Sequence, residues 1–476
     1  MRLGAAALVS IGVLFAAHEA RADPLPTNDY AIDLFQGPLL APLRVIGIGG
    51  AYSAYAEGIS GFVSNAAAPA VRPPYSFTEV SGDITGSVSF PLNLFNNNDF
   101  SDSGRRDYNY SSFVYLTGGA MLQAGPAGIG VLGELQSYTV ASADGEKTHI
   151  LVGKYHALAA TSVFRGQAAV GAGIRAVTLG MSAPSIDLTM AGIAPEIGFL
   201  VRPDNLPFRA GATFRFPVSG TALNQPVKPG PDGLRRIGSF LLPREVVLPW
   251  ELELGVAFQA GARPLNPPWI DPNEAEEPIE HRVALARKAR ARIHERTDAA
   301  LPSDARAAYD VASKKVEEAQ RREEEKYLDE EERYMEDQRA ARFEALPRER
   351  LLVTLSLIVS GSVDDGIGIE RFLAQGVSGQ DTSHAIGTSG ATPSFSPRLG
   401  LETEPILDVL ETRTGTYYEP NRFGKVGRQH FTFGGDMRLF STTFWGLIRK
   451  TTYCLSTAID IAPRYQSASL GVGVWH

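Results

Sequence analysis

The stretch of sequence that decides the fold reads Trp250-Glu-Leu-Glu-Leu-Gly-Val-Ala-Phe258. Every second residue from Trp250 to Phe258 is large and apolar, and the residues between them are charged or small. Because successive side chains of a β-strand point to opposite faces, this period of two gives the segment one apolar face and one polar face. The segment is therefore predicted to be a strand that separates an apolar environment from a polar one.

The same alternation continues along most of the chain after Tyr75. We expect fourteen strands, near residues 75–90, 108–121, 127–141, 148–163, 166–179, 186–201, 207–217, 246–261, 349–363, 396–404, 409–418, 429–441, 453–463 and 466–476. Alternation also suits a soluble sandwich with its apolar faces inside. Segments of about ten residues cross a bilayer when tilted. We therefore predict an all-β, transmembrane antiparallel β-barrel of about 14 strands, over residues 75–476.

The connections between the predicted strands favour the same architecture. Those after the first, third, fifth and seventh strands are predicted to be long, and those after the second, fourth and sixth to be short. Outer-membrane barrels have short periplasmic turns and longer outer loops. An even number of strands then places both ends of the barrel on the periplasmic side.

Composition narrows the compartment and the partners. Met1-Arg2, the apolar run Ala5–Ala17 and Ala20-Arg21-Ala22 follow the order of a secretory signal peptide, predicted over residues 1–22. The single cysteine, Cys454, excludes an internal disulfide framework and a cysteine-based zinc site. A net charge of -8 without a basic patch argues against nucleic acid as a partner. No catalytic or nucleotide motif stands in a suitable context, so neither an enzyme nor a cofactor is expected.

Residues 271–346 break the period of two. They are charged, rich in Ala and Glu, and free of Gly. Pro302-Ser303-Asp304 predicts a stop and a helix cap between two helices, the second running from Ser303 to Leu346. We predict a charged α-helical hairpin insert on the periplasmic side. The sequence leaves open whether it is only a solvated hairpin or also docks a periplasmic protein partner.

A glycine-rich motif precedes the first predicted strand. Residues 47–69 read Gly47-Ile-Gly-Gly-Ala-Tyr-Ser-Ala-Tyr-Ala-Glu-Gly-Ile-Ser-Gly-Phe-Val-Ser-Asn-Ala-Ala-Ala-Pro69. The motif resembles the N-terminal hatch of the FadL-like outer-membrane transporters and of the related PorV-type barrels. Eight residues fall in register with that pattern: Gly49, Gly50, Ala51, Tyr52, Ala54, Ala56, Ser60 and Asn65. Glu57 stands in place of the first Asp of the pattern, Gly58 replaces the second, and Ala66-Ala67-Ala68 replaces Pro-Ala-Gly.

The resemblance implies that residues 23–74 fold into the barrel lumen as a hatch. The residues singled out for this hatch or gate are Gly47, Gly49, Gly50, Tyr52 and Asn65. Glycines let the backbone pack closely or take positive φ, and Asn satisfies backbone groups in turns. In transporters of this family, hydrophobic substrates such as long-chain fatty acids pass the hatch, so uptake of such molecules is the leading prediction. The alternatives are a non-transporting PorV-type scaffold and a polar porin.

The polar faces of the predicted strands give the residues of the lumen. They carry charges of both signs: Glu134, Arg175, Glu196, Arg209, Arg215, Glu251, Glu253, Arg398, Glu402, Glu404, Glu411, Arg413, Asp436, Arg438 and Asp460. An Arg or Lys facing lipid near the midplane costs about 2–4 kcal/mol, so these side chains are expected to face inward. Arg–carboxylate pairs would then brace the barrel and hold the hatch; a hydrophilic pore is the alternative.

Apolar residues outside the strands are candidates for ligand contact and for the membrane interface. Phe35, Leu39, Leu94, Phe95 and Phe100 are predicted to contact a hydrophobic small-molecule ligand. Tyr417, Tyr418 and Phe423 are predicted to join an aromatic girdle at the interface with the outer-membrane lipid.

Overall fold

The computed structural model describes residues 27–35, 37–72, 79–92, 99–100, 102, 109–141, 147–183, 186–223, 227–238, 240–269, 271–378, 389–444 and 448–475. The predicted signal peptide, Leu94 and Phe95 lie outside the described residues.

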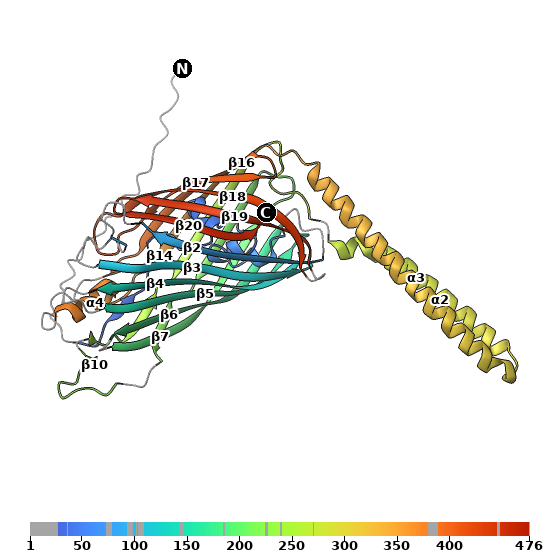
Figure 1. Ribbon diagram of the computed structural model, residues 1–476, viewed down its shortest axis with the longest axis horizontal. Coiled ribbons are helices and arrows are strands. Elements are labelled where there is room, and N and C mark those ends of the chain that lie inside the picture. Colours follow the sequence, from blue (N-terminus) through green and yellow to red (C-terminus); the bar gives the residue numbers. More distant parts are fainter. Residues whose placement is uncertain are drawn as a thin grey trace, which may run out of the picture.

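Fourteen strands of the described chain form a closed wall. In chain order they are β2 (Val80–Pro91), β3 (Asn109–Ala124), β4 (Ala127–Ala141), β5 (Lys147–Val163), β6 (Ala168–Ala183), β7 (Ile186–Val201), β8 (Phe208–Arg215), β13 (Glu251–Gly261), β14 (Arg350–Ser360), β16 (Ser394–Ile406), β17 (Leu410–Glu419), β18 (Arg428–Phe444), β19 (Ile448–Ala462) and β20 (Tyr465–Val474). Each is antiparallel to the next, and β20 pairs with β2, which closes the barrel (Figure 1). The predicted fold class is confirmed.

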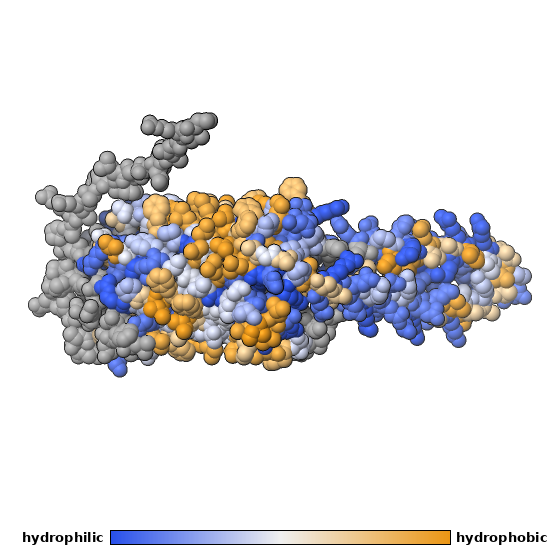
Figure 2. All heavy atoms as spheres, turned by 90° about the horizontal axis from the view of Figure 1, so that it is seen from above, coloured by the Kyte–Doolittle hydropathy of each residue, from blue (hydrophilic) through white to orange (hydrophobic). Residues whose placement is uncertain are grey.

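The two faces of the wall differ as the alternation predicts. On β13, Leu254, Val256 and Phe258 are exposed on the outside, whereas Glu253 and Ala257 are buried inside. Figure 2 shows apolar residues gathered over the barrel wall. An antiparallel barrel with an apolar outer belt and a polar interior is an outer-membrane-type barrel.

The two ends of the barrel carry different connections. One end, called the loop end, bears the described residues 92, 99–100, 102, 216–223, 227–238, 240–250, 361–378 and 389–393; the other, called the turn end, bears tight connections such as 125–126 and 407–409. The prediction of a long connection after the fifth strand is wrong. β6 runs on to Ala183, which pairs with Ile186 at the start of β7, because the alternation of side chains continues past residue 179 and extends the ladder.

The N-terminal segment, residues 27–72, runs through the barrel from the loop end to the turn end. Its elements are β1 (Ala31–Asp33), α1 (Leu43–Gly47) and the short 3-10 helices η1 (Ile59–Val63) and η2 (Ala68–Ala70). β1 lies between β12 (Glu245–Leu248) and β15 (Gly366–Gly368), parallel to both. The remaining elements of the loop end are β9 (Val218–Ala222), β10 (Arg236–Ile237), β11 (Phe240–Leu241) and α4 (Ile369–Ser378). α1 contacts the inner faces of β17, β18 and β19, and η2 contacts those of β4, β5 and β6.

Two long helices leave the turn end between β13 and β14. α2 (Pro272–Ala300) and α3 (Ser303–Glu344) form an antiparallel pair, called the arm, that projects away from the barrel (Figure 1). No residue of α3 is buried, as expected for a solvated hairpin. The predicted cap by a side chain is absent at α3, whose N-cap is Pro302. Among the described helices, none is both long and apolar enough to cross a membrane.

Candidate functional site

Close backbone contacts seat the N-terminal segment against the wall. The backbones of Gly47 and Gly434 meet so closely that a Cβ added to Gly434 would lie 2.8 Å from the Gly47 Cα. Gly49 has a φ of +65°, and a Cβ there would lie 2.7 Å from the backbone nitrogen of Thr416. Gly50 also has positive φ. Side chains at these positions would push the segment off β17 and β18.

Asn65 and Tyr52, the other predicted gate residues, are fully buried within the segment. The Asn65 amide donates hydrogen bonds to the carbonyls of Ser53 and of Phe199 on β7, both at 3.0 Å. Tyr52 packs edge-on against Tyr55, with 5.7 Å between the ring centroids. Asn65 thus links the segment to the wall, whereas Tyr52 belongs to its core.

The first group of lumen charges, called the Glu402 network, consists of Arg44, Arg350, Glu402, Glu411, Arg413 and Asp436. Glu402 accepts from Arg413 Nε at 2.6 Å and lies 3.2 Å from Arg350 Nη2 and 3.3 Å from Arg44 Nη2. Arg413 also contacts Glu411 and Asp436. Three arginines and three carboxylates therefore neutralise one another, and Arg44 brings the N-terminal segment into the network.

The second group, called the Arg215 network, lies on β5–β8 and β13. Its members are His156, Arg175, Glu196, Arg215, Glu251 and Glu253. Arg175 Nη1 lies 2.8 Å from Glu251 Oε2, and Arg215 Nη1 lies 3.2 Å from Glu253 Oε2. Arg215 also donates to the carbonyl of Val63 in the N-terminal segment. This network, like the first, ties the wall to the segment.

A third group, called the His430 network, consists of Tyr417, Glu419, Arg428, His430 and Asp460. His430 Nδ1 lies 2.8 Å from Asp460 Oδ1, and its Nε2 lies 2.6 Å from Glu419 Oε2. Tyr417 stacks on His430 at 4.3 Å and donates to Asp460 at 2.7 Å. The prediction that Tyr417 joins the interfacial girdle is wrong: it follows Arg413 at even spacing on β17, so its ring faces the lumen.

The remaining predicted lumen charges have individual surroundings. Arg209 pairs with Glu57 of the N-terminal segment at 2.6 Å, and Arg398 Nη1 lies 3.4 Å from the Gly50 carbonyl oxygen. Glu404 pairs with Arg263 at 3.2 Å. Arg438 lies at the turn end, 3.8 Å from Asp408 and partly exposed, so it borders the lumen rather than lining it.

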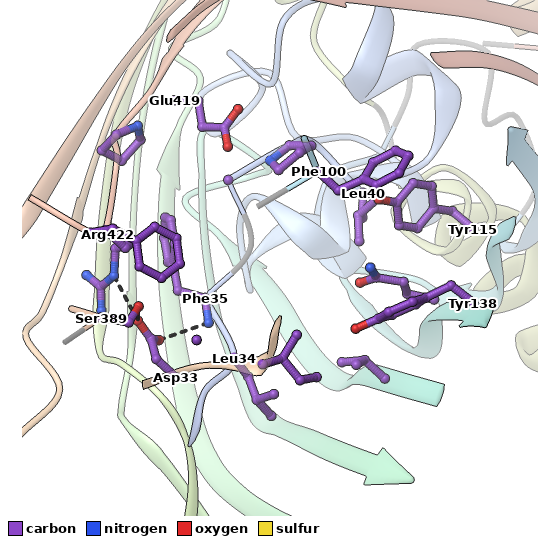
Figure 3. A pocket seen from close by; sticks show the side chains of 18 of the residues that line it. Asp33, Leu34, Phe35, Leu40, Phe100, Tyr115, Tyr138, Ser389, Glu419 and Arg422 are labelled. Atoms are coloured by element: carbon purple, nitrogen blue, oxygen red, sulfur yellow. Dashed lines mark hydrogen bonds and ion pairs between the residues drawn. The ribbon is translucent and has the colours of Figure 1, made fainter. Parts of the chain in front are cut away.

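At the loop end the lumen holds a pocket with aromatic walls, called the aromatic pocket. Six aromatic residues line this pocket: Phe35, Phe100, Phe113, Tyr115, Tyr138 and Phe423. Figure 3 shows Phe35 beside Arg422 and Asp33, facing Phe100, Tyr115 and Tyr138. Two predicted contact residues, Phe35 and Phe100, thus meet here. Phe423, predicted for the girdle, lines this pocket as well.

One ion pair, between Asp33 and Arg422, lies at the polar edge of the aromatic pocket. Asp33 accepts from Arg422 Nε at 3.1 Å and from the Ser389 hydroxyl at 2.8 Å. The Arg422 guanidinium lies 4.8 Å from the centre of the Phe35 ring.

The pocket contains about 50 Å³ of free volume. An apolar cavity of about 150 Å³ is known to hold benzene, so a ring-sized ligand needs the lining to move.

A second cavity, with polar walls, adjoins the aromatic pocket. It contains about 110 Å³ and is lined by all members of the Arg215 network except Glu196, together with Glu134, Lys154, Arg398 and Leu39. Gly37, Pro38 and Leu40 line both spaces. Leu39, predicted as a ligand contact, therefore faces the charged cavity. Within the described residues, no cluster of three or more His, Cys, Asp or Glu side chains is arranged to hold a metal ion.

Sequence reasoning missed several residues of these sites. Tyr115 and Tyr138 lie at inward positions of β3 and β4. The alternation of side chains that predicted the charged residues of the lumen predicts these inward aromatic residues as well. Arg44 lies three residues before the glycine motif and gave no separate signal. Asp33 and Arg422 are brought together only by the fold, because they lie 389 residues apart.

Similarity to known proteins is found among solved structures. No protein-family model and no curated protein matches the chain. Among solved structures it is similar to a Pseudomonas aeruginosa FadL homologue, with a TM-score of 0.46 and 8% identity over 92% of this chain and 99% of that chain. It is also similar to the P. putida toluene transporter TodX (TM-score 0.45, 10% identity, 92% and 98% covered) and to the CymD monoaromatic hydrocarbon channel (0.44, 10%, 91% and 96%). The relation to PorV-type barrels stays a prediction.

Proposed function

We propose that this protein is an outer-membrane transport barrel that takes up hydrophobic small molecules such as long-chain fatty acids or monoaromatic hydrocarbons. The aromatic pocket is the observation that carries the proposal. Ligand sites are concave and mainly apolar, with a few fixed polar groups, and this pocket has aromatic walls with Asp33 and Arg422 at its edge. The adjoining second cavity is bordered by charged side chains such as Arg175, Arg215 and Glu251, which favour no apolar guest.

The N-terminal segment is the proposed hatch and gate, over residues 23–74. It supplies Phe35 and Leu40 to the aromatic pocket and Arg44 to the Glu402 network. Because the pocket has about 50 Å³ of free volume, a ligand enters only if part of its lining moves.

Uptake in cells tests the proposal. Cells with and without the protein receive a labelled long-chain fatty acid in one arm and labelled toluene in the other. We expect uptake of at least one probe to fall when the protein is absent and to return when it is restored. If the uptake of each probe is the same in cells with and without the protein, the result contradicts transport of hydrophobic molecules.

The arm favours a second candidate, a PorV-type scaffold that binds a periplasmic protein. A solvated helical pair of this length has no place in the lumen and contributes nothing to the aromatic pocket. Unchanged uptake, together with a co-purifying protein that is lost on deletion of residues 271–346, supports the scaffold. Ion conductance by the intact protein supports a polar porin, whereas conductance that appears only after residues 23–74 are removed supports a sealing hatch.

A further inference from the structure

The chain between β13 and the arm folds back against the turn end of the barrel. We call residues 263–269 the root of the arm. Leu265 is buried in the same hydrophobic cluster as Tyr55, Ala56 and Phe62 of the N-terminal segment. The root therefore touches the inside of the barrel, although the helices that follow it are solvated.

One arginine joins the root to the N-terminal segment. Arg209, on the inner face of β8, is fully buried. Its Nη1 lies 2.6 Å from Glu57 Oε1, its Nε donates to Asn266 Oδ1 at 2.6 Å, and its Nη2 donates to the Leu265 carbonyl at 2.9 Å. The guanidinium of Arg209 thus contacts the N-terminal segment and the root at once. If either of them moved alone, Glu57 or Asn266 would lose its contact with Arg209.

A second arginine repeats the arrangement. Arg202, at the end of β7, donates to the carbonyl of Arg72 at 2.6 Å and contacts the carbonyl of Pro267 at 3.4 Å. The Arg72 guanidinium in turn lies 5.0 Å from the centre of the Trp269 ring. The last residues of the N-terminal segment and the last residues before α2 are therefore linked directly and through Arg202.

The second helix of the arm, α3, also contacts the root near its C-terminal end. Phe343, near the end of α3, lies between the guanidinium groups of Arg263 and Arg348, at 5.5 and 5.3 Å from its ring centre. The backbone nitrogen of Arg263 donates to the Glu349 carbonyl at 3.2 Å. Both ends of the arm are thus in contact with one another beside the root.

We propose that the arm is a lever coupled to the N-terminal segment, so that the orientation of the helices and the position of residues 51–72 are linked. At 1.5 Å per residue α3 is about 60 Å long, so a small rotation at the root is a large displacement at the tip. Coupling between two sites is reciprocal. Loosening the N-terminal segment must therefore loosen the arm, and loosening the root must loosen the segment. This inference concerns the link alone and holds whether or not the barrel transports anything.

The first experiment disturbs the N-terminal segment and observes the arm. Spin labels are placed at Lys326→Cys on α3 and at Thr161→Cys on the barrel, in a Cys454→Ser background, in the purified full-length protein. We expect the distance distribution between the labels to broaden in Glu57→Gln. The matched control is Arg464→Gln, which removes ion pairs with Asp99 and Asp102 at the loop end of the barrel, and its distribution should stay as in the parent. Equal distributions in the parent and Glu57→Gln overturn the proposal.

The second experiment runs in the opposite direction and does not depend on the first variant folding. Asn266→Ala removes the root's side-chain contact with Arg209, and hydrogen exchange is followed at residues 51–66. We expect exchange there to rise about fivefold or more, the lower range of measured couplings. Glu324→Ala, which only removes the ion pairs to Arg287 and Arg290 within the arm, is the control. Exchange at residues 51–66 that is unchanged in Asn266→Ala overturns the proposal. A heat-dependent shift in gel mobility verifies that each variant forms the barrel.

Discussion

Arg44 Nη2 lies 3.3 Å from Glu402 Oε1, although 358 residues separate the two along the chain. Arg44 belongs to α1 inside the barrel, Glu402 to the inner face of β16, and both side chains are buried. Glu402 also contacts Arg350 on β14 and Arg413 on β17. One carboxylate therefore joins the N-terminal segment to the wall, and the wall strands to one another.

Arg44→Met tests whether this ion pair holds the segment in place. The substitution keeps an unbranched, apolar stem, removes the guanidinium group and leaves Glu402 paired with Arg350 and Arg413. We expect a loss of about 1.5–3 kcal/mol, as for hydrogen bonds to charged groups, confined to the docking of the segment. Ion conductance in planar bilayers should rise, while the heat-dependent gel shift of the barrel stays the same.

Arg321→Met is the matched control for Arg44→Met. Arg321 pairs with Glu317 at 3.3 Å on α3, where the two side chains are 64% and 70% exposed. Exposed pairs contribute about 0–1 kcal/mol, so conductance should remain at the parent level. Equal behaviour of the two variants would show that the contact with Glu402 does not retain the segment.

Leu470→Arg tests the assignment of the outer face to lipid. Leu470 lies in the middle of β20 and is exposed on the outside of the wall. A lipid-facing Arg costs about 2–4 kcal/mol near the midplane, so the free energy of folding into lipid vesicles, measured by urea titration, should fall by that amount. Val426→Arg, in the connection after β17 and also exposed, should change it little. An equal effect of both substitutions argues against lipid contact at Leu470.

The period of two was sufficient to predict the wall. Residues 250–258 already separate an outward Leu254 from an inward Glu253, and the same parity places Glu402, Arg413 and Asp460 in the lumen. The prediction for Tyr417 was wrong because it followed the preference of aromatic residues for the membrane interface. The alternation of side chains along β17 places Tyr417 on the inner face. Local alternation is the stronger signal, because the pleat fixes the side of every second residue.

Contacts between distant segments were beyond the reach of the sequence. Parity gives the face of a side chain but not its partner across the lumen, which depends on closure of the barrel and on the path of the N-terminal segment. The aromatic pocket combines residues of that segment, of β3, β4, β5 and β17, and of three connections. No single stretch carries its pattern, so Phe35 and Phe100 were predicted as ligand contacts without Tyr115 or Arg422.

Phe35→Ala tests the aromatic pocket by ligand affinity. Loss of one aromatic contact is worth about 0.5–1.5 kcal/mol, so the Kd of a labelled hydrophobic probe for the purified barrel should rise roughly 2- to 12-fold. Phe164→Ala, in the tight turn after β5 where the ring is 78% exposed, serves as the control and should bind as the parent does. A Kd that is the same in all three proteins places the ligand elsewhere.

Acid provides a separate test of the link between Glu57 and Arg209. Burial opposes ionisation of Glu57, but Arg209, with Arg44 and Arg202 beyond it, more than offsets this and holds the pKa of Glu57 below its ordinary value. A carboxyl group whose folded pKa is depressed contributes stability above its unfolded pKa, about 4.3, and loses it as the pH falls through the folded pKa. Hydrogen exchange at residues 51–66, corrected for its intrinsic rate, should therefore be equally slow at pH 7 and pH 5 and become faster below about pH 4.

Glu57→Gln isolates this titration from those of the other carboxylates. The variant lacks the titrating group, so its exchange at residues 51–66 should be faster than in the parent at pH 7, and the difference between the two proteins should shrink as the parent is protonated in acid. A difference that already disappears between pH 7 and pH 5 would mean that the pKa of Glu57 is raised rather than lowered. In that case the field of the surrounding arginines does not outweigh burial, and the Glu57–Arg209 contact is a hydrogen bond of a neutral carboxyl group rather than an ion pair.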